Sequence, residues 1–231
     1  ALAAPDVRLD VCGTTARRAR GRVARMSTPE FRAMWDRRYG GEEYEFGTEP
    51  NEFLAERLPS LPRGTAMCVA EGEGRNAVFL AQAGYAVSAV DLSEAGVEKT
   101  RRLAAARGVQ VDASVGDLAD FDLGRDRWDL VVSIFAHMPA AIRRDLHRRI
   151  VRSLKPGGVL LLEAYTPDQI GRGTGGPKSP EFLMTLAGLR DELAPLEFEH
   201  GAELVREIRE GPAHVGEGAV VQVIARRPPD A

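Results

Sequence analysis

A short apolar run that breaks into a glycine-spaced turn constrains this chain more than any other feature. Residues 66–76 read Ala-Met-Cys-Val-Ala-Glu-Gly-Glu-Gly-Arg-Asn, and a helical pattern follows them. Glycines such as Gly72 and Gly74 adopt positive φ and let a ligand approach closely, while the free amides of the helix N-terminus face the turn. The stretch therefore predicts a first strand and a nucleotide-binding turn. A Gly-x-Gly turn also occurs in purely structural connections, so the turn alone leaves both interpretations open.

Short apolar runs alternate with helical patterns after this turn, which is typical of a parallel sheet with helices on both faces. A helix capped by Ser93 and a helix from Pro139 to the turn at 155–158 are the clearest. The last two strands are separated by a short loop, which favours antiparallel pairing. We expect an α/β fold with a doubly wound, seven-stranded, mostly parallel sheet and an antiparallel last strand. The expected strands are 66–70, 86–90, 109–115, 128–135, 159–165, 203–209 and 219–225.

The regions outside this pattern define the expected domain organisation. Residues 1–25 are rich in arginine and lack periodicity, so we expect a disordered extension, with a transit peptide as the alternative and Met26 as a candidate initiator. Residues 26–231 are expected to form one domain. Its helical cap spans 26–62, where the apolar stripe around Trp35 is typical of core packing. Its lid, a mobile loop and helix, spans 166–193, because 166–180 is rich in Gly, Thr and Pro.

Composition excludes several classes of protein. The chain has 231 residues, is 44% hydrophobic and carries a net charge of -3, which gives no reason to expect a nucleic-acid partner. No apolar run reaches the roughly twenty residues of a membrane span. Two cysteines, Cys12 and Cys68, are too few for a disulfide framework, so a cytoplasmic location is expected. We identify no metal site, and the sequence is compatible with a monomer or a homodimer.

Chemistry-bearing residues follow the ends of several expected strands. In open α/β sheets a ligand lies beyond the carboxyl ends of the strands, next to the first one. Asp91 ends the second strand about twenty residues after the glycine turn, where a carboxylate accepts both hydroxyls of a ribose. Asp117 follows the third strand, and Ser133, Ile134 and Phe135 end the fourth. Each acid alone also suits a structural role, since Asp91 could cap a helix and Asp117 could stabilise a turn.

With these residues in this order, residues 26–228 resemble the class I S-adenosylmethionine-dependent methyltransferases. The resemblance implies that the glycine turn wraps the methionine part of the cofactor, Asp91 holds the ribose and Asp117-Leu118 contacts the adenine. It also implies S-adenosyl-L-methionine as cofactor and S-adenosyl-L-homocysteine as product. The cofactor-binding residues expected from it are Trp35, Ala70, Glu71, Gly72, Gly74, Arg75, Asn76, Asp91, Leu92, Ser93, Asp117, Leu118, Ser133, Ile134 and Phe135.

Arg75, Asn76 and the early Trp35-Asp36-x-x-Tyr39 segment are more narrowly similar to the tellurite-resistance and thiol methyltransferases. The chain departs from the wider family at Cys68, where an acid is usual, and at Ala70, where a glycine is usual. The acid has moved to Glu71 or Glu73, which leaves open the group that orders the methionine amine.

The expected mechanism is a single in-line displacement that depends mainly on positioning the acceptor. A thiolate, selenide or telluride needs no strong base, whereas an oxygen or nitrogen acceptor does. His137, just after the fourth strand, is the best-placed base, with a packing role as the equal alternative. Tyr165 and Glu163 are further candidates at the same edge. We expect a small-molecule acceptor, because no motif or basic patch typical of methyltransferases that act on nucleic acid or protein is present.

Two other classes of function remain open from the sequence. Gly72-x-Gly74-x-x-Ala77 followed by Asp91 also fits a looser dinucleotide fingerprint, which would indicate an NAD(P)-dependent oxidoreductase. The antiparallel ending and the missing second mononucleotide half count against this alternative. The second alternative is a protein that binds S-adenosylmethionine without turnover. Cys68 and Ala70, which depart from the family pattern, are compatible with it.

Overall fold

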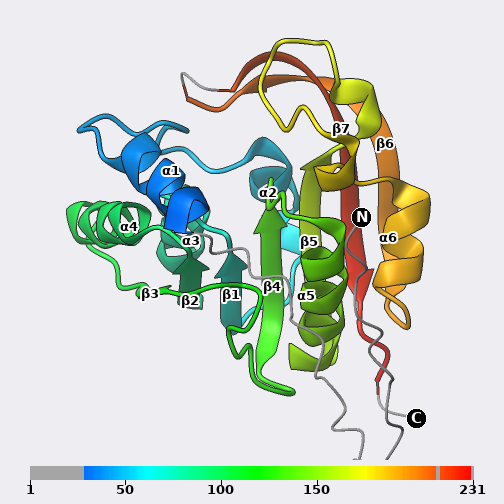
Figure 1. Ribbon diagram of the computed structural model, residues 1–231. Coiled ribbons are helices and arrows are strands. Elements are labelled where there is room, and N and C mark those ends of the chain that lie inside the picture. The colour runs from blue at the N-terminus through cyan, green and yellow to red at the C-terminus, as the bar shows by residue number, and fades with distance from the viewer. Residues whose placement is uncertain (1–28, 212–213, 230–231) are drawn as a thin grey trace, which may run out of the picture.

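Seven strands form one sheet in the computed structural model, which describes residues 29–211 and 214–229. Their order is β3-β2-β1-β4-β5-β7-β6. β1 to β5 pair in parallel, and β7 is antiparallel to both β5 and β6. The expected doubly wound α/β fold is therefore confirmed (Figure 1). The strands are β1 Thr65–Val69, β2 Ala86–Asp91, β3 Asp112–Val115, β4 Trp128–Ile134, β5 Leu154–Tyr165, β6 Glu197–Arg209 and β7 Val215–Arg226.

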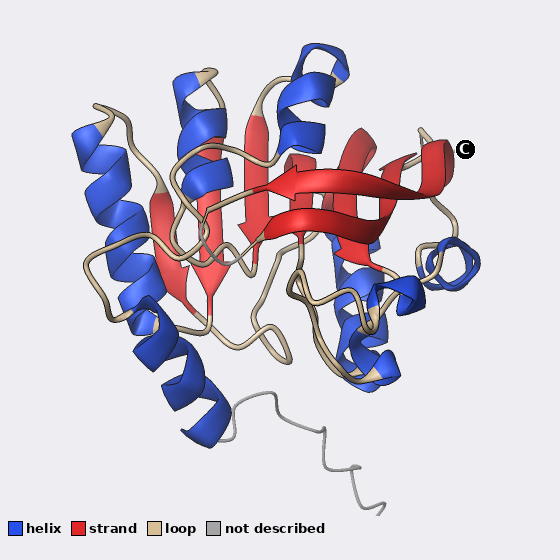
Figure 2. Cartoon of the chain, turned by 90° about the horizontal axis from the view of Figure 1, so that it is seen from above, coloured by secondary structure: helices blue, strands red, loops and turns tan. Residues whose placement is uncertain are grey.

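Helices cover both faces of the sheet (Figure 2). Alternate residues of one strand point to opposite faces, so Met67 and Val69 of β1 belong to the core beneath α5 and α6, whereas Ala66 and Cys68 belong to the core beneath α2 and α3. The helices are α1 Pro29–Tyr39, α2 Glu52–Arg57, α3 Arg75–Gln82, α4 Glu94–Ala106, α5 Ala140–Ser153 and α6 Leu186–Glu192, and the 3-10 turns are Leu58–Ser60, Pro167–Gln169 and Pro180–Phe182. None of these helices is both long enough and apolar enough to cross a bilayer.

Strand ends differ from the sequence prediction where glycine-rich segments were interpreted as loops. The expected turn at 155–158 lies inside β5, because the backbone of Gly157 and Gly158 pairs with Arg227. The second half of the expected loop at 211–218 belongs to β7, because residues 215–218 pair with β6 in the hairpin. β3 is shorter than expected, and the expected helix at 180–193 is a 3-10 turn followed by α6. Residues 1–25 and Met26 lie outside the described residues.

α1 does not supply a core stripe, contrary to the sequence interpretation. Only Tyr39 of this helix is buried; Met34 is 40% exposed, and Trp35 is half-buried. Asp36 accepts a hydrogen bond of 2.6 Å from Ser93, which holds the helix near the start of α4. α1 therefore covers the carboxyl edge of the sheet, on the side of β1 and β2 (Figure 1).

Candidate active site

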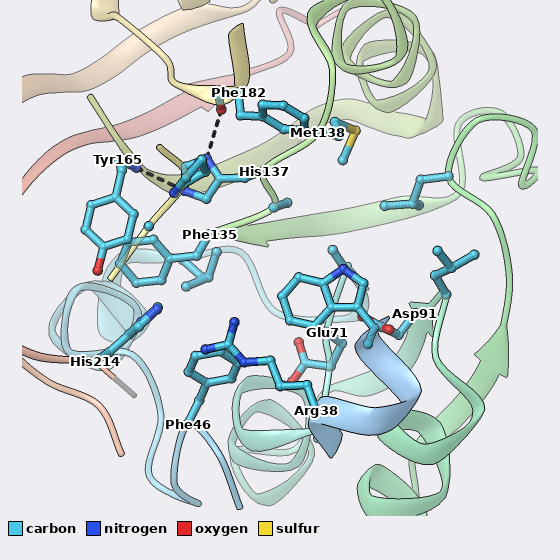
Figure 3. A pocket seen from close by; sticks show the side chains of 18 of the residues that line it. Arg38, Phe46, Glu71, Asp91, Phe135, His137, Met138, Tyr165, Phe182 and His214 are labelled. Atoms are coloured by element: carbon cyan, nitrogen blue, oxygen red, sulfur yellow. Dashed lines mark hydrogen bonds between the residues drawn. The ribbon is translucent and has the colours of Figure 1, made fainter. Parts of the chain in front are cut away.

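A cavity of about 480 Å³ lies at the carboxyl edge of the sheet, and its size suits a nucleoside-containing ligand. α1, the turn after β1, the ends of β2, β4 and β5, the loop after β5 and the β6–β7 hairpin all contribute side chains to it. Figure 3 shows two ends: Glu71 and Asp91 lie on one side, while His137 and Tyr165 lie on the other, beside Phe135.

Most of the residues predicted from sequence line this cavity together. Those that line it are Trp35, Ala70, Glu71, Arg75, Asn76, Asp91, Leu92, Leu118, Ile134, Phe135, His137 and Tyr165. Five others lie in the structure around it: Gly72, Gly74, Ser93, Asp117 and Ser133. Among these, Asp117 accepts a hydrogen bond of 2.9 Å from the amide of Ala119, and Ser133 is buried in β4.

The glycines of the turn make room for protein atoms. Gly72 and Gly74 have φ of 66° and 95°, the left-handed region that glycine adopts without strain. A Cβ on Gly72 would lie 2.9 Å from the Tyr39 hydroxyl, and a Cβ on Gly74 would lie 2.7 Å from the Cα of Thr100. From the sequence we expected a ligand to approach the backbone of these two glycines closely. In the structure, α1 packs against Gly72 and α4 packs against Gly74 instead.

Ala70 occupies a strained backbone conformation in the same turn. Its φ is 50°, at the position where the resembled family carries glycine. A left-handed conformation costs a residue with a Cβ about 1–2 kcal/mol, so we expect Ala70→Gly to increase the free energy of unfolding by about 1 kcal/mol. Urea denaturation measures this change. Ala81→Gly in the helical α3 is the control and should instead destabilise the protein by about 1 kcal/mol. Destabilisation by both substitutions would contradict the strain argument.

Asp91 joins the turn after β1 to the start of α4. Its Oδ2 accepts the amide of Gly72 and its Oδ1 accepts the amide of Ser93, both at 2.8 Å. Burial raises the pKa of Asp91 to about 6, although these hydrogen bonds oppose the shift. Each carboxylate oxygen can accept a further hydrogen bond, so the side chain keeps acceptor capacity on the cavity side.

Glu71 and Glu73, the two candidates for the displaced acid, have different environments. Glu71 lines the cavity, and its Oε1 accepts the amides of Asn76 and Ala77 at the start of α3. Glu73 instead forms a buried ion pair of 2.8 Å with Lys99. Burial raises the pKa of Glu71 to about 7, against the effect of the two amides. Of the two acids, only Glu71 lines the cavity.

We expect the affinity for S-adenosylmethionine to increase between about pH 5.5 and 7, because a cationic ligand favours the ionised form of Glu71 and displaces its proton. The increase should approach tenfold per pH unit below the pKa of about 7. Calorimetric titrations in buffers of different ionisation enthalpy measure affinity and proton release together. In Glu71→Gln the remaining pH dependence should centre lower, near the Asp91 pKa of about 6. An unchanged profile in this variant would contradict the assignment.

His137 has a packing role in this structure. Its Nδ1 lies 2.9 Å from the carbonyl oxygen of Phe182, and its Nε2 accepts the amide of Tyr165 at 3.3 Å. Burial lowers the pKa of His137 to about 4. Both ring nitrogens are occupied by the backbone, so the geometry favours the packing alternative over a general base. His137 stacks on Tyr165 with 5.6 Å between ring centroids and fixes the wall of the cavity.

Tyr165 is fully buried, and burial raises the pKa of its hydroxyl, which opposes a role as a base. Glu163, the third candidate from the sequence, is also fully buried and bonds Arg206 at 2.8 and 3.0 Å. It belongs to a buried polar network behind the cavity. The members of this network are Asn51, Arg75, Asn76, Glu163, Arg206, Glu210 and Gln222, and the exposed Glu52 bonds Arg206 at its edge.

Several residues at the aromatic end were missed by the sequence argument. His214, on the β6–β7 hairpin, lies 4.6 Å from Phe46 and 5.1 Å from Phe135 between ring centroids. Phe182 and Met138 also line the cavity (Figure 3). His214 carried no sequence signal, because it lies in a segment that was interpreted as loop. Phe46 lies in the irregular segment between α1 and α2.

The loop after β5 closes one side of the cavity. Residues 176–179 line it, and Gln169 bonds the hydroxyl of Thr174 at 2.9 Å. Thr174 in turn donates a hydrogen bond of 2.6 Å to the carbonyl of Glu217 on β7. A Cβ on Gly176 would lie 2.7 Å from Tyr165, so this glycine lets the loop pack directly on the ring. The loop is anchored to the hairpin at this point.

Comparison with known proteins agrees with the site. Residues 66–158 match the profile of a family described as Methyltransferase domain. A curated relative, the 2-heptyl-1-hydroxyquinolin-4(1H)-one methyltransferase of Mycobacteroides abscessus, is 25% identical over 158 residues, which cover 61% of this chain and 70% of the relative. Together with the fold, these matches support an S-adenosylmethionine-dependent methyltransferase.

Solved structures share the architecture. A structure from a study of the conversion of a disulfide bond into a thioacetal group during echinomycin biosynthesis has a TM-score of 0.71, with 21% identity over 88% of this chain and 93% of that chain. TehB from Haemophilus influenzae has a TM-score of 0.64, with 15% identity over 85% of this chain and 66% of that chain. These similarities establish the fold.

Proposed function

We propose that this protein transfers a methyl group from S-adenosylmethionine to a small, planar acceptor whose nucleophile is already ionised near neutral pH. A thiol is the first candidate, with selenium and tellurium compounds in the same class. One observation carries this proposal. At the aromatic end of the cavity, among the described residues, neither histidine nor Tyr165 is suited to take up a proton at neutral pH, because burial lowers both histidine pKa values to about 4 and raises that of Tyr165.

The cofactor is proposed to occupy the end that contains Asp91 and Glu71. Asp91 has acceptor capacity for the ribose hydroxyls, Leu92 and Leu118 offer apolar surface to the adenine, and Glu71 suits the methionine ammonium. S-adenosylmethionine supplies an electrophilic methyl group on a positively charged sulfur. The faces of Trp35 and Phe135 suit that positive charge. The cavity, with carboxylates at one end and aromatic rings at the other, fits such a ligand.

The residues of the protein then position the acceptor and exclude water. Phe135, Tyr165 and Phe182 enclose a flat ring, and residues 176–179 form the proposed lid. Because displacement at the methyl group is in line, holding the acceptor against the sulfur is the main contribution of the protein. We also propose that the described residues act as a single domain, with 166–193 as the lid region.

A second acceptor class is an acidic hydroxyl on a heteroaromatic ring. The aromatic walls of the cavity favour it, and the curated relative is named for a 1-hydroxyquinolin-4(1H)-one substrate. A hydroxyl on nitrogen ionises more readily than an alcohol, so this class meets the same requirement as a thiol.

An acceptor panel with labelled S-adenosylmethionine tests the proposal. The panel contains thiophenol, benzeneselenol, tellurite with a reductant, 1-hydroxyquinolin-4(1H)-one, aniline and benzyl alcohol, with tRNA and a protein mixture as macromolecular arms. We expect label transfer to at least one of the first four and none to aniline or benzyl alcohol. Preferential transfer to aniline, benzyl alcohol, tRNA or protein would overturn the proposal.

A further inference from the structure

Arg75 lines the cavity and has a buried donor that no described residue uses. One of its nitrogens, Nη2, donates to Glu210 at 2.5 Å, and the side chain is only 8% exposed. Its other terminal nitrogen, Nη1, is buried and has no hydrogen-bond partner among the described residues. A buried donor without a partner costs about 1–3 kcal/mol, so its retention in a ligand cavity calls for a ligand.

His214 provides a second such atom, on the hairpin that also carries Glu210, the partner of Arg75. The amide of Glu210 donates to the carbonyl of His214 at 2.9 Å, so the partner of Arg75 and His214 are neighbours at the hairpin. The His214 side chain lines the cavity, 7% of the residue is exposed, and Nδ1 is buried without a partner among the described residues. Figure 3 shows His214 reaching into the cavity toward Phe135 and Arg38.

We propose that Arg75 and His214 form a carboxylate-binding subsite on the hairpin side of the cavity. An arginine N–H and an imidazole N–H are both donors, and a carboxylate is the planar acceptor that a guanidinium binds best. Glu210 occupies only Nη2 of Arg75, so the hydrogens of Nη1 remain for a ligand. This proposal rests on the proposed function only in the choice of ligands, which are the cofactor and the acceptor of a methyl transfer.

Two molecules in this reaction can supply the carboxylate: the methionine part of the cofactor and the acceptor. If the acceptor supplies it, the substrate class narrows to aromatic thiols or hydroxyls that carry an acidic group. Paired ligands distinguish the sources. Decarboxylated S-adenosylmethionine is compared with S-adenosylmethionine, and thiophenol is compared with thiosalicylate.

Calorimetric titration of the wild-type protein with all four ligands gives the two preferences. In one of the two ligand pairs, we expect the ligand with the carboxylate to bind about 10- to 100-fold more tightly than the ligand without it. This factor is the contribution of a hydrogen bond to a charged group. Arg75→Lys keeps a cation for Glu210 but cannot reach with a second nitrogen, and should reduce that preference at least tenfold. His214→Phe keeps the ring packing and should reduce it by a smaller factor.

Arg57→Lys is the matched control, because Arg57 also has a buried unpartnered nitrogen but lies on α2, outside the cavity lining. Thermal unfolding checks that each variant folds. Preferences unchanged in both Arg75→Lys and His214→Phe, or no carboxylate preference in the wild type, overturn the subsite. Failure of the wild-type protein to bind either cofactor is a different outcome: it overturns the proposed function, while the acceptor pair still tests the subsite.

Discussion

Asp91→Asn is expected to weaken the binding of S-adenosylmethionine by about two orders of magnitude. The substitution removes the negative charge of the carboxylate that would accept hydrogen bonds from the ribose hydroxyls. It also places the amide NH₂ of asparagine against the backbone N–H of either Gly72 or Ser93, both of which now donate to Asp91. The loss of hydrogen bonds to a charged group, each about 1.5–3 kcal/mol, accounts for that factor. Titration calorimetry of the two proteins measures it directly.

Asp112→Asn is the control for this experiment, since Asp112 is an exposed acid on the neighbouring strand β3. It should bind the cofactor as the wild type does. Because Asp91 also holds the turn, the melting temperature of Asp91→Asn must be recorded without ligand. Wild-type affinity in a folded Asp91→Asn protein would show that the cofactor does not use this carboxylate.

Arg206→Met is expected to lower the free energy of unfolding by about 3–5 kcal/mol. Arg206 bonds both oxygens of Glu163, which is fully buried, and also bonds Glu210. Removing Arg206 leaves the buried negative charge of Glu163 without its cation, and this uncompensated charge lowers the free energy of unfolding. Guanidinium denaturation monitored by circular dichroism measures the change.

Arg209→Met on the same strand is the matched control, because its side chain is 75% exposed and should change stability by less than about 0.5 kcal/mol. Adding Glu163→Gln to Arg206→Met should restore part of the loss, since the uncompensated charge is then gone. Equal stability of Arg206→Met and Arg209→Met would show that the buried network does not depend on Arg206.

The sequence predicted the fold because strand and helix patterns alternate clearly from residue 66 to 165. Parallel strands buried on both faces are nearly continuous apolar runs, and Ser93 caps its helix as expected. Prediction failed where glycines lie in strands. Gly157 and Gly216 have φ of 79° and 117°, and only their pairing with distant residues shows that they belong to β5 and β7.

The residues at the end of the cavity proposed for the cofactor could be predicted to lie together, because they follow local motifs at the ends of strands. The aromatic end could not be predicted. His214 reaches the cavity only through the long β6–β7 hairpin, and Phe182 only through the loop after β5, so tertiary contacts alone reveal them. His137 was correctly placed beside the cavity, but its hydrogen bonds to the backbone of Phe182 and Tyr165 were invisible in the sequence.

A crystal structure of the protein with S-adenosylhomocysteine and thiosalicylate would locate both ligands in the cavity. We expect the ribose at Asp91, the adenine between Leu92 and Leu118, and the aromatic ring against Phe135 and Tyr165, with the two sulfur atoms facing each other. Adenosine at the aromatic end, or a ligand bound outside this cavity, would contradict it.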